Sequence, residues 1–190
     1  MMNKELPSSP RSLKWTRLPS DGVLFHCVEH GKKIGTLQWE RGNTRDGLAQ
    51  MPSGGFLLRR AGFWSQYRMI LAADSGVEEA RLIDRWRGRL LRIPNAPSYV
   101  MTHTAKRVPT PVDEWCFSDA GGTRIIRFHD ADLRKGEFEL SVEIADTPID
   151  PRQLDIALVA GLFWVLFDLV LRAEIVGMDA SLASIATSSR

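Results

Sequence analysis

Arginine is concentrated in one short stretch of the chain, "ARLIDRWRGRLLRI", between Ala80 and Ile93. The guanidinium group matches phosphate in shape and charge, and a neighbouring tryptophan is typical of the boundary between lipid and water. The stretch therefore predicts a surface patch that binds the anionic headgroups of phospholipids. The patch consists of Arg81, Arg85, Trp86, Arg87, Arg89 and Arg92.

The same stretch has a second interpretation, which depends on a turn at Arg87-Gly88. Alternate residues of a strand share a face, so Arg81 and Arg85 would point to the same side, with Arg89 and Arg92 on the returning strand. The arginines would then lie on a solvated outer face of a sheet and pair with nearby carboxylates. The carboxylates available for pairing are those of Glu78, Glu79 and Asp84.

The histidines and cysteines do not form a recognisable metal or catalytic pattern. His26 and His30 lie four residues apart with Cys27 between them, and on a strand that spacing is about 13 Å, too long for one ion. Cys27 and Cys116 are predicted to be buried free thiols in a reducing compartment. Phosphate loops, dinucleotide fingerprints and nucleophile elbows are absent from the sequence. The sequence therefore predicts no cofactor, no metal and no catalytic residue, and a role other than that of an enzyme.

Asp168 is the one acidic residue near the end of a long apolar stretch, "LDIALVAGLFWVLFDLVL", from Leu154 to Leu171. Arg172 follows four residues later, and this spacing suits an ion pair on the surface of a helix. A buried acid of catalytic use is the alternative interpretation. We expect Asp168 to pair with Arg172 near the end of the helix.

The start of this helix is defined by local signals. Asp150 is suited to cap the free N–H groups, and Pro151 loses nothing at the first helical position because its missing N–H would have no partner. Gln153 is placed to reach back to the cap as in a capping box. Gly177 is the predicted stop.

The length of the apolar run separates a core helix from a membrane span. The uninterrupted part, Ile156 to Phe167, has about 12 residues and a length of about 18 Å, against about 30 Å for the hydrocarbon layer. Extending the run to Leu171 places the charge of Asp168 in lipid, at a cost of a few kcal/mol. We expect a core helix, and a membrane-spanning helix over Leu154–Leu171 is the alternative.

The rest of the chain reads as short strands with turn residues every 8 to 12 positions, approximately the spacing of a sandwich or barrel. "FELSVEI" alternates apolar and polar residues, as a strand with one buried face does. Hairpins are predicted around Ala120–Gly122 and across a polar linker, Asp130–Lys135. A helix that is apolar on every side must be enclosed on every side, and about 12 strands leave room for one. The predicted fold is mainly β, a closed antiparallel barrel of about 12 strands around a hydrophobic C-terminal helix.

Length and charge limit the remaining possibilities. A chain of 190 residues fits one domain, predicted here over residues 13–176 between a flexible N-terminal tail, 1–12, and a C-terminal tail, 177–190. The net charge of +2 gives no general field for nucleic acid. The N-terminal residues contain no apolar signal segment, which predicts the cytoplasm, with attachment to the membrane surface left open.

The segment "GEFELSVEIADTPIDPRQLDIALVAGLFWVLFDLVL", Gly136 to Leu171, resembles the tubby C-terminal domain-like superfamily. That superfamily includes the LURP-one-related proteins and the phospholipid scramblases, and the likeness extends over residues 13–176. It implies a closed barrel around a buried helix, a mostly non-enzymatic role and an association with membrane lipids, which tubby domains bind through basic surface residues. No residue of this chain is aligned with that lipid site, and a cation-binding loop of the scramblase kind is missing.

Together these observations predict a non-catalytic barrel that binds anionic phospholipid headgroups or a protein partner at its surface, and not nucleic acid. The oligomeric state is left open. One alternative is an integral membrane or scramblase-like protein that uses Leu154–Leu171 as a span. Another is a small-ligand carrier or an enzyme with a pocket between barrel and helix.

Overall fold

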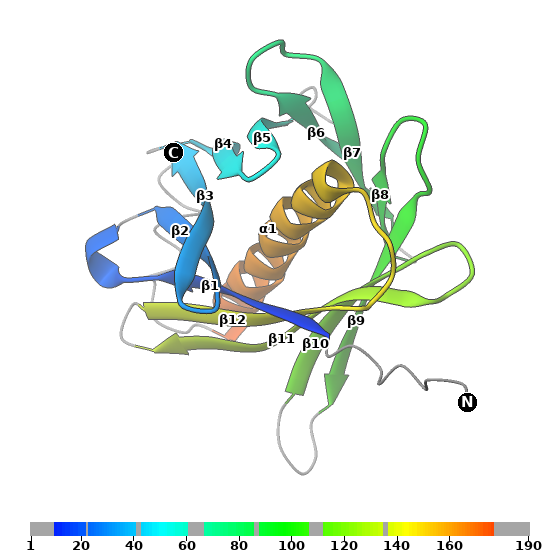
Figure 1. Cartoon of the computed structure of the whole chain (residues 1–190). Coiled ribbons are helices and arrows are strands. Elements are labelled where there is room, and N and C mark those ends of the chain that lie inside the picture. The colour runs from blue at the N-terminus through cyan, green and yellow to red at the C-terminus, as the bar shows by residue number, and fades with distance from the viewer. Residues whose placement is uncertain are drawn as a thin grey trace, which may run out of the picture.

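The computed structural model describes residues 10–21, 23–40, 43–60, 67–85, 88–106, 112–134 and 137–176, although not every side chain within them. Over these residues, twelve antiparallel strands form one closed sheet around a single long helix, as Figure 1 shows. The strands are β1 (Arg11–Arg17), β2 (Leu24–Glu29), β3 (Lys32–Glu40), β4 (Asn43–Met51), β5 (Gly54–Arg60), β6 (Tyr67–Ala72), β7 (Glu78–Arg85), β8 (Gly88–Arg92), β9 (Tyr99–Lys106), β10 (Val112–Ser118), β11 (Arg124–Arg134) and β12 (Glu137–Ile144). A short 3₁₀ turn, Pro19–Asp21, follows β1, and the helix α1 covers Pro151–Val176.

Each strand pairs with its neighbours in the chain, and β1 pairs with β12 to close the barrel. The sequence prediction of a closed antiparallel barrel around a C-terminal helix is therefore confirmed. Closure leaves every strand with two hydrogen-bonded neighbours, so the sheet has no open edge.

The two faces of the wall follow the alternation of the sequence. On β12 the side chains of Phe138, Leu140, Val142 and Ile144 point inward and are buried, whereas Glu137 and Glu139 are exposed. This is the arrangement that the "FELSVEI" pattern predicted, because successive residues of a strand point to opposite faces.

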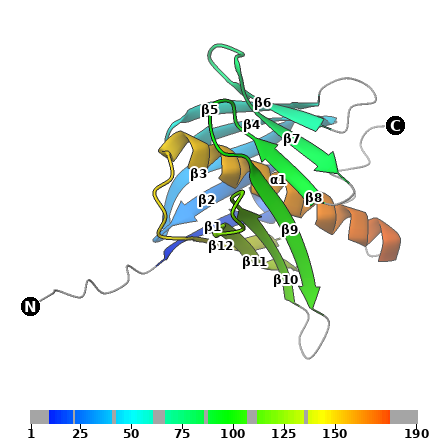
Figure 2. The same cartoon turned by 90° about the vertical axis from the view of Figure 1, so that its right-hand side faces the viewer.

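α1 occupies the interior of the barrel, as Figure 1 shows in a view from the start of the helix. Every residue from Leu154 to Leu166 is buried, which explains why this part of the sequence lacks a polar face. In Figure 2 the C-terminal end of α1 extends beyond the strands next to it. Over the part of the chain that the structure describes, no helix has both the length and the hydropathy needed to cross a membrane.

The closest approach between helix and wall occurs at Gly161. A Cβ atom at this position would lie 2.0 Å from Cζ of Phe128, whose ring points inward from β11. Glycine is therefore required here for packing, since any side chain would push the helix away from the wall.

The helix begins where the sequence predicted. Oδ1 of Asp150 accepts hydrogen bonds from the backbone N–H groups of Arg152 (2.9 Å) and Gln153 (3.1 Å), which confirms Asp150 as the N-cap. The predicted capping-box role of Gln153 is wrong: its side-chain oxygen instead accepts a bond from the hydroxyl of Tyr99 on β9, at 3.3 Å. The side chain of Gln153 therefore contacts the barrel wall, where the hydroxyl of Tyr99 donates to it.

One predicted connection is a strand. The polar segment Asp130–Lys135 was expected to be a loop, but β11 continues to Arg134 and pairs with β12 on both sides of an irregularity between His129 and Asp132. Asp130 has a positive φ of 51° at this bulge. β11 is held by two neighbouring strands, so its polar residues remain in the sheet and the extra residues are absorbed by the bulge.

Both ends of the chain lie largely outside the described residues. β1 begins at Arg11, inside the segment predicted as the N-terminal tail. Residues 1–9, the predicted stop at Gly177 and the rest of 177–190 are not described.

Candidate functional site

The structure divides the predicted arginine patch between the two faces of the wall. Arg81 on β7 and Arg92 on β8 lie opposite each other on the outer face. Arg89 points into the barrel, because it is three residues from Arg92 on the same strand and an odd spacing reverses the face. The side chain of Arg85, and both Trp86 and Arg87, lie outside the described residues.

The outward arginines belong to a line of residues that crosses four strands. The register pairs Arg59 of β5 with Met69 of β6, Met69 with Arg81, and Arg81 with Arg92. All three arginines are exposed; we call Arg59, Arg81 and Arg92 the arginine row. Arg59 extends the predicted patch, and its alignment with Arg81 across β6 could have been found only once the register was known.

The members of the arginine row differ in their ionic partners. Glu78 binds Arg81 through both carboxylate oxygens, with 2.8 Å between Nη2 and Oε2, as the solvated-surface interpretation predicted for one of the arginines. Within the described part of the chain, Arg59 and Arg92 have no such partner. Glu78, Arg81, Arg92 and Pro94 line a surface hollow of about 250 Å³.

Aliphatic residues lie beside the arginine row on the outer face. The next outward positions pair Ile83 of β7 with Leu90 of β8, and Leu90 with Val100 of β9. Ile83 and Leu90 are half-buried and Val100 is 38% exposed. The outer face of β5–β9 therefore combines guanidinium groups with an accessible aliphatic strip.

Inside the barrel, Arg89 joins the helix to the wall. Its Nη1 and Nη2 atoms donate to Oδ2 and Oδ1 of Asp168 at 2.8 and 2.5 Å, and Trp115 Nε1 donates to Oδ2 of Asp168 at 2.7 Å. Arg89 Nε also donates to Oδ1 of Asp84 at 3.0 Å, and Trp164 Nε1 donates to the same oxygen at 3.1 Å. Side chains from β7, β8, β10 and α1 thus form one hydrogen-bonded network.

This network changes the interpretation of Asp168. The predicted partner was Arg172, whose side chain lies outside the described ones, whereas the observed partners are Arg89 and Trp115. Both carboxylate oxygens are bound by donors, as in a structural ion pair. The geometry therefore favours a role in holding the helix and gives no support to a catalytic acid.

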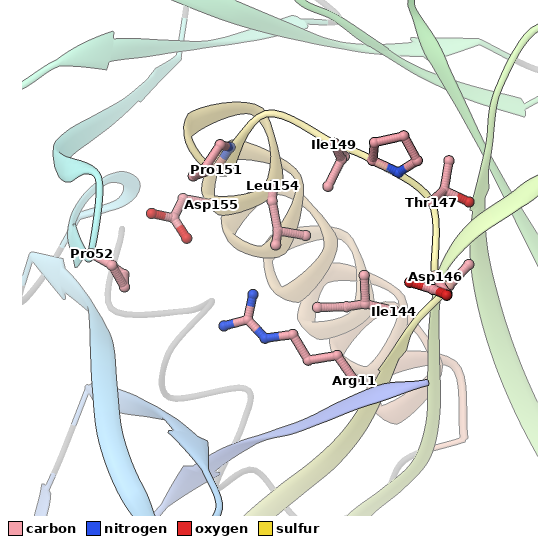
Figure 3. A pocket seen from close by; sticks show the side chains of 11 residues that line it. Arg11, Pro52, Ile144, Asp146, Thr147, Ile149, Pro151, Leu154 and Asp155 are labelled. Carbon is pink, nitrogen blue, oxygen red and sulfur yellow. The ribbon is translucent and has the colours of Figure 1, made fainter. Parts of the chain in front are cut away.

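A pocket of about 470 Å³ lies at the opposite end of the barrel, where α1 begins; Figure 3 shows its lining side chains. Its apolar walls come from three segments: Ile144 at the end of β12, Ile149 in the connection to the helix, and Leu154 in the first helical turn. Its charged side chains are those of Arg11, Asp146 and Asp155, and Arg11 and Asp155 face one another across it. We call it the helix-start pocket.

Each of these two charged groups has only some of its hydrogen-bonding positions filled. Glu29 binds Nε and Nη2 of Arg11 at 2.5 and 3.0 Å, and this hydrogen bond is the main cause that raises the pKa of Arg11. Oδ2 of Asp155 accepts the backbone N–H of Ser53 at 2.8 Å, and Asp155 is only 5% exposed. Nothing in the sequence connected these residues, because they come from β1, the β4–β5 turn and the helix.

The two cysteines are buried free thiols, as predicted. Burial raises the pKa of Cys27 to about 12, with a further contribution from the negative charge of Asp155. Burial and a hydrogen bond to Glu114 raise the pKa of Cys116 to about 12. Neither thiol ionises near neutral pH, so neither has the reactivity of a catalytic nucleophile.

The histidines lie apart, each beside an acidic residue or in a turn. His26 is 3.3 Å from Asp21, His103 is 3.1 Å from Asp113 and stacks on Trp115, and His129 is 2.7 Å from Asp130; His30 lies in the β2–β3 turn. Among the residues described, no group of three or more His, Cys, Asp or Glu side chains is arranged to hold a metal ion.

We compared the chain with protein-family models, with curated proteins and with solved structures, and none of the three comparisons gave a match. The site is thus defined by its own geometry: an outward arginine row on β5–β8 and a pocket at the start of the helix.

Proposed function

We propose that the protein is a binding module that attaches to anionic phospholipid surfaces through the arginine row. The observation that carries this proposal is that two guanidinium groups of the row are exposed and lack an ionic partner among the described residues. Arg59 and Arg92 are exposed and have no ionic partner in the described part of the chain, so both are available to lipid phosphates.

Two cations on the opposite wall of the barrel are paired with carboxylates. Lys14 on β1 lies 2.5 Å from Glu139, and on β11 Arg127 lies 3.0 Å from Glu143. Their charges are matched locally, so they contribute little to the attraction of an outside anion. β1 is six strands away from β7 around the barrel order, so Arg59 and Arg92 lie on the side away from Lys14. Lys32 and Lys33 on β3, in contrast, are exposed cations without an ion pair among the described residues.

The strip beside the arginine row also fits a membrane surface. Ile83, Leu90 and Val100 are aliphatic and partly accessible, and apolar groups next to basic ones are typical of proteins that lie at the lipid boundary. A headgroup phosphate in the hollow beside Arg81 and Arg92 would place this strip against the interface.

We further propose that the barrel is related to the tubby C-terminal domain-like superfamily. The support is architectural: twelve antiparallel strands close around a helix that directly follows the last strand, as the sequence resemblance implies. The lipid association of that superfamily agrees with the proposed role of the arginine row.

Vesicle flotation tests the proposal with the full chain. Vesicles of phosphatidylcholine alone are compared with vesicles that also contain phosphatidylserine or a phosphatidylinositol phosphate. We expect flotation with anionic vesicles only, and a loss of binding in salt, which screens exposed charges over about 10 Å at 0.1 M. The combined variant Arg59→Gln/Arg81→Gln/Arg92→Gln should bind about 30-fold or more weakly, because each basic residue at the surface contributes about 1 kcal/mol.

Lys14→Gln is the matched control, because it removes an outward cation from the opposite wall. It should float like the unmodified protein. Equal recovery in the soluble fraction with every lipid would refute attachment to membranes, and would direct the search for a partner of the arginine row to acidic proteins. Unchanged flotation of the combined variant would show that another surface binds the lipid.

A further inference from the structure

Three charged side chains line the helix-start pocket, those of Arg11, Asp146 and Asp155, and the opposite charges of Arg11 and Asp155 do not meet. Glu29 accepts hydrogen bonds from Nε and Nη2 of Arg11, which leaves both N–H groups of Nη1 and the second N–H of Nη2 as donors. Ser53 occupies Oδ2 of Asp155, which leaves Oδ1 as the remaining acceptor. Among the described residues, no hydrogen bond or ion pair joins Arg11 to Asp155, and Figure 3 shows the guanidinium and carboxylate groups facing each other across a gap.

Asp155 is the member of this pair that most needs a partner. Its carboxylate is almost completely removed from bulk water, and one backbone N–H donates to it, while Arg11 and Arg152 act on it through their charge without a hydrogen bond. Asp155 lines the pocket, and its Oδ1 is not among the fully buried side-chain atoms that lack a hydrogen bond. An ammonium group would supply the charge-assisted hydrogen bond that the chain does not.

The end of the helix itself is not the anion-binding element of this pocket. Asp150 already accepts the N–H groups of Arg152 and Gln153, so these donors are unavailable to a ligand. The position for an anionic group is therefore next to Nη1 of Arg11, on the wall formed by β1.

The remaining walls of the pocket are apolar and favour a ligand with an aliphatic side chain. Ile144, Ile149 and Leu154 form the apolar part of the lining. The volume of about 470 Å³ falls in the range of about 300–1,000 Å³ of small-molecule sites, which commonly combine apolar walls with a few polar groups.

We propose that the helix-start pocket binds a small aliphatic zwitterion, of the class of branched-chain α-amino acids. The ammonium group binds Oδ1 of Asp155, the carboxylate binds Nη1 of Arg11, and the side chain packs on Ile144 and Leu154. This site lies at the mouth of the barrel on β1, β12 and α1, away from the arginine row on β5–β8, and does not depend on lipid binding.

Isothermal titration of the full chain with four probes tests each part of this assignment. L-Leucine has the ammonium group, the carboxylate and the aliphatic side chain. Isocaproate lacks the ammonium group, isopentylamine lacks the carboxylate, and glycine lacks the aliphatic side chain. We expect leucine to bind about tenfold or more tightly than each of the other three, since one charge-assisted hydrogen bond contributes about that factor.

Two variants connect the binding to the named atoms. Asp155→Asn removes the charge but keeps an oxygen for the N–H of Ser53, so it should weaken leucine about tenfold and leave isocaproate unchanged. Arg11→Gln should weaken leucine and leave isopentylamine unchanged. Arg92→Gln, in the arginine row, is the matched control and should bind leucine normally.

The outcomes separate this proposal from the lipid proposal. Absence of saturable leucine binding refutes the zwitterion site whatever the vesicles show, and equal affinity for leucine in Asp155→Asn refutes the assignment to that carboxylate. The melting temperature of each variant is measured alongside. If Asp155→Asn does not fold, Arg11→Gln tests the site instead, because Arg11 is half-exposed and its replacement is tolerated more easily. Weaker binding of leucine with unchanged binding of isopentylamine supports the site, and unchanged binding of leucine refutes it.

Discussion

Arg89 on β8 holds both carboxylate oxygens of Asp168 on α1, at distances of 2.8 and 2.5 Å. The two residues are 79 positions apart in the sequence, and their side chains are 18% and 14% exposed. Because Trp115 also donates to Asp168, the C-terminal part of the helix is connected to two separate strands of the wall. The pair is therefore a polar attachment between helix and barrel at this end.

Removing one member of this pair should destabilise the fold strongly. Arg89→Met leaves the carboxylate of Asp168 inside the barrel with Trp115 as its remaining donor among the described side chains, and an unpaired buried charge costs about 3–5 kcal/mol. We expect a loss of about 2–4 kcal/mol in the free energy of unfolding, since the pair is not fully buried. Urea denaturation followed by tryptophan fluorescence measures it.

The double variant Arg89→Met/Asp168→Leu is the control for this prediction. It removes both charges together, so it should lose less stability than the sum of the single variants. Additive losses would show that the ion pair contributes nothing beyond the packing of its side chains.

Gly161→Ala should destabilise the barrel although alanine favours helices. The new methyl group would overlap the ring of Phe128, which is fully buried, so the ring or the helix would have to shift against the surrounding core. We expect overpacking to cost about 1–3 kcal/mol, and the gain of about 1 kcal/mol in helix propensity to reduce the net loss to at most about 2 kcal/mol. The midpoint of chemical denaturation measures the change.

A smaller side chain in place of Phe128, opposite the glycine, provides the control. Phe128→Leu alone leaves a cavity and costs stability, but the double variant Gly161→Ala/Phe128→Leu should be more stable than the two separate losses predict. If Gly161→Ala is as stable as the unmodified protein, the close contact between helix and wall is not a constraint on the fold.

The fold was predictable because its main signals are local. The apolar faces of α1 and the alternation in β12 each follow from a few adjacent residues, and an all-apolar helix requires a complete wall around it. Asp150 was identified as the cap for the same reason, since capping uses N–H groups two or three residues away.

The residues of the two candidate sites depend on register, which local sequence does not specify. The spacing around Asp168 pointed to Arg172, the nearest cation on the same helix, whereas the observed partner Arg89 is brought in by the pairing of strands far along the chain. The inward direction of Arg89 was available from its odd spacing to Arg92. The approach of Arg11 to Asp155 was not, because it depends on where the helix enters the barrel.

Loss of the helix cap should have a moderate effect. Asp150→Ala removes the acceptor for two backbone N–H groups at the start of α1, and such caps contribute about 0.5–2 kcal/mol. Asp150→Ser, which keeps an acceptor oxygen, should recover most of the lost stability. Thermal denaturation by circular dichroism compares the three proteins, and equal losses in the two variants would exclude a capping role.

The stability of the protein should fall at alkaline pH through Cys27. Its pKa is raised by burial from an ordinary value of 9.0 to about 12, so between these values the unfolded chain releases a proton that the folded one keeps. Unfolding is then favoured as the pH rises, and the stabilising contribution that is complete below pH 9.0 is lost by about pH 12.

Cys27→Ala isolates this contribution from those of other groups that titrate in the same range. The variant should be less stable near neutral pH because it leaves a small cavity, but its free energy of unfolding should decline less steeply above pH 9.0. Urea denaturation at a series of pH values gives both slopes. Parallel slopes for the two proteins would mean that the thiol of Cys27 ionises as readily in the folded barrel as in the unfolded chain, and would remove burial as the factor that keeps it protonated.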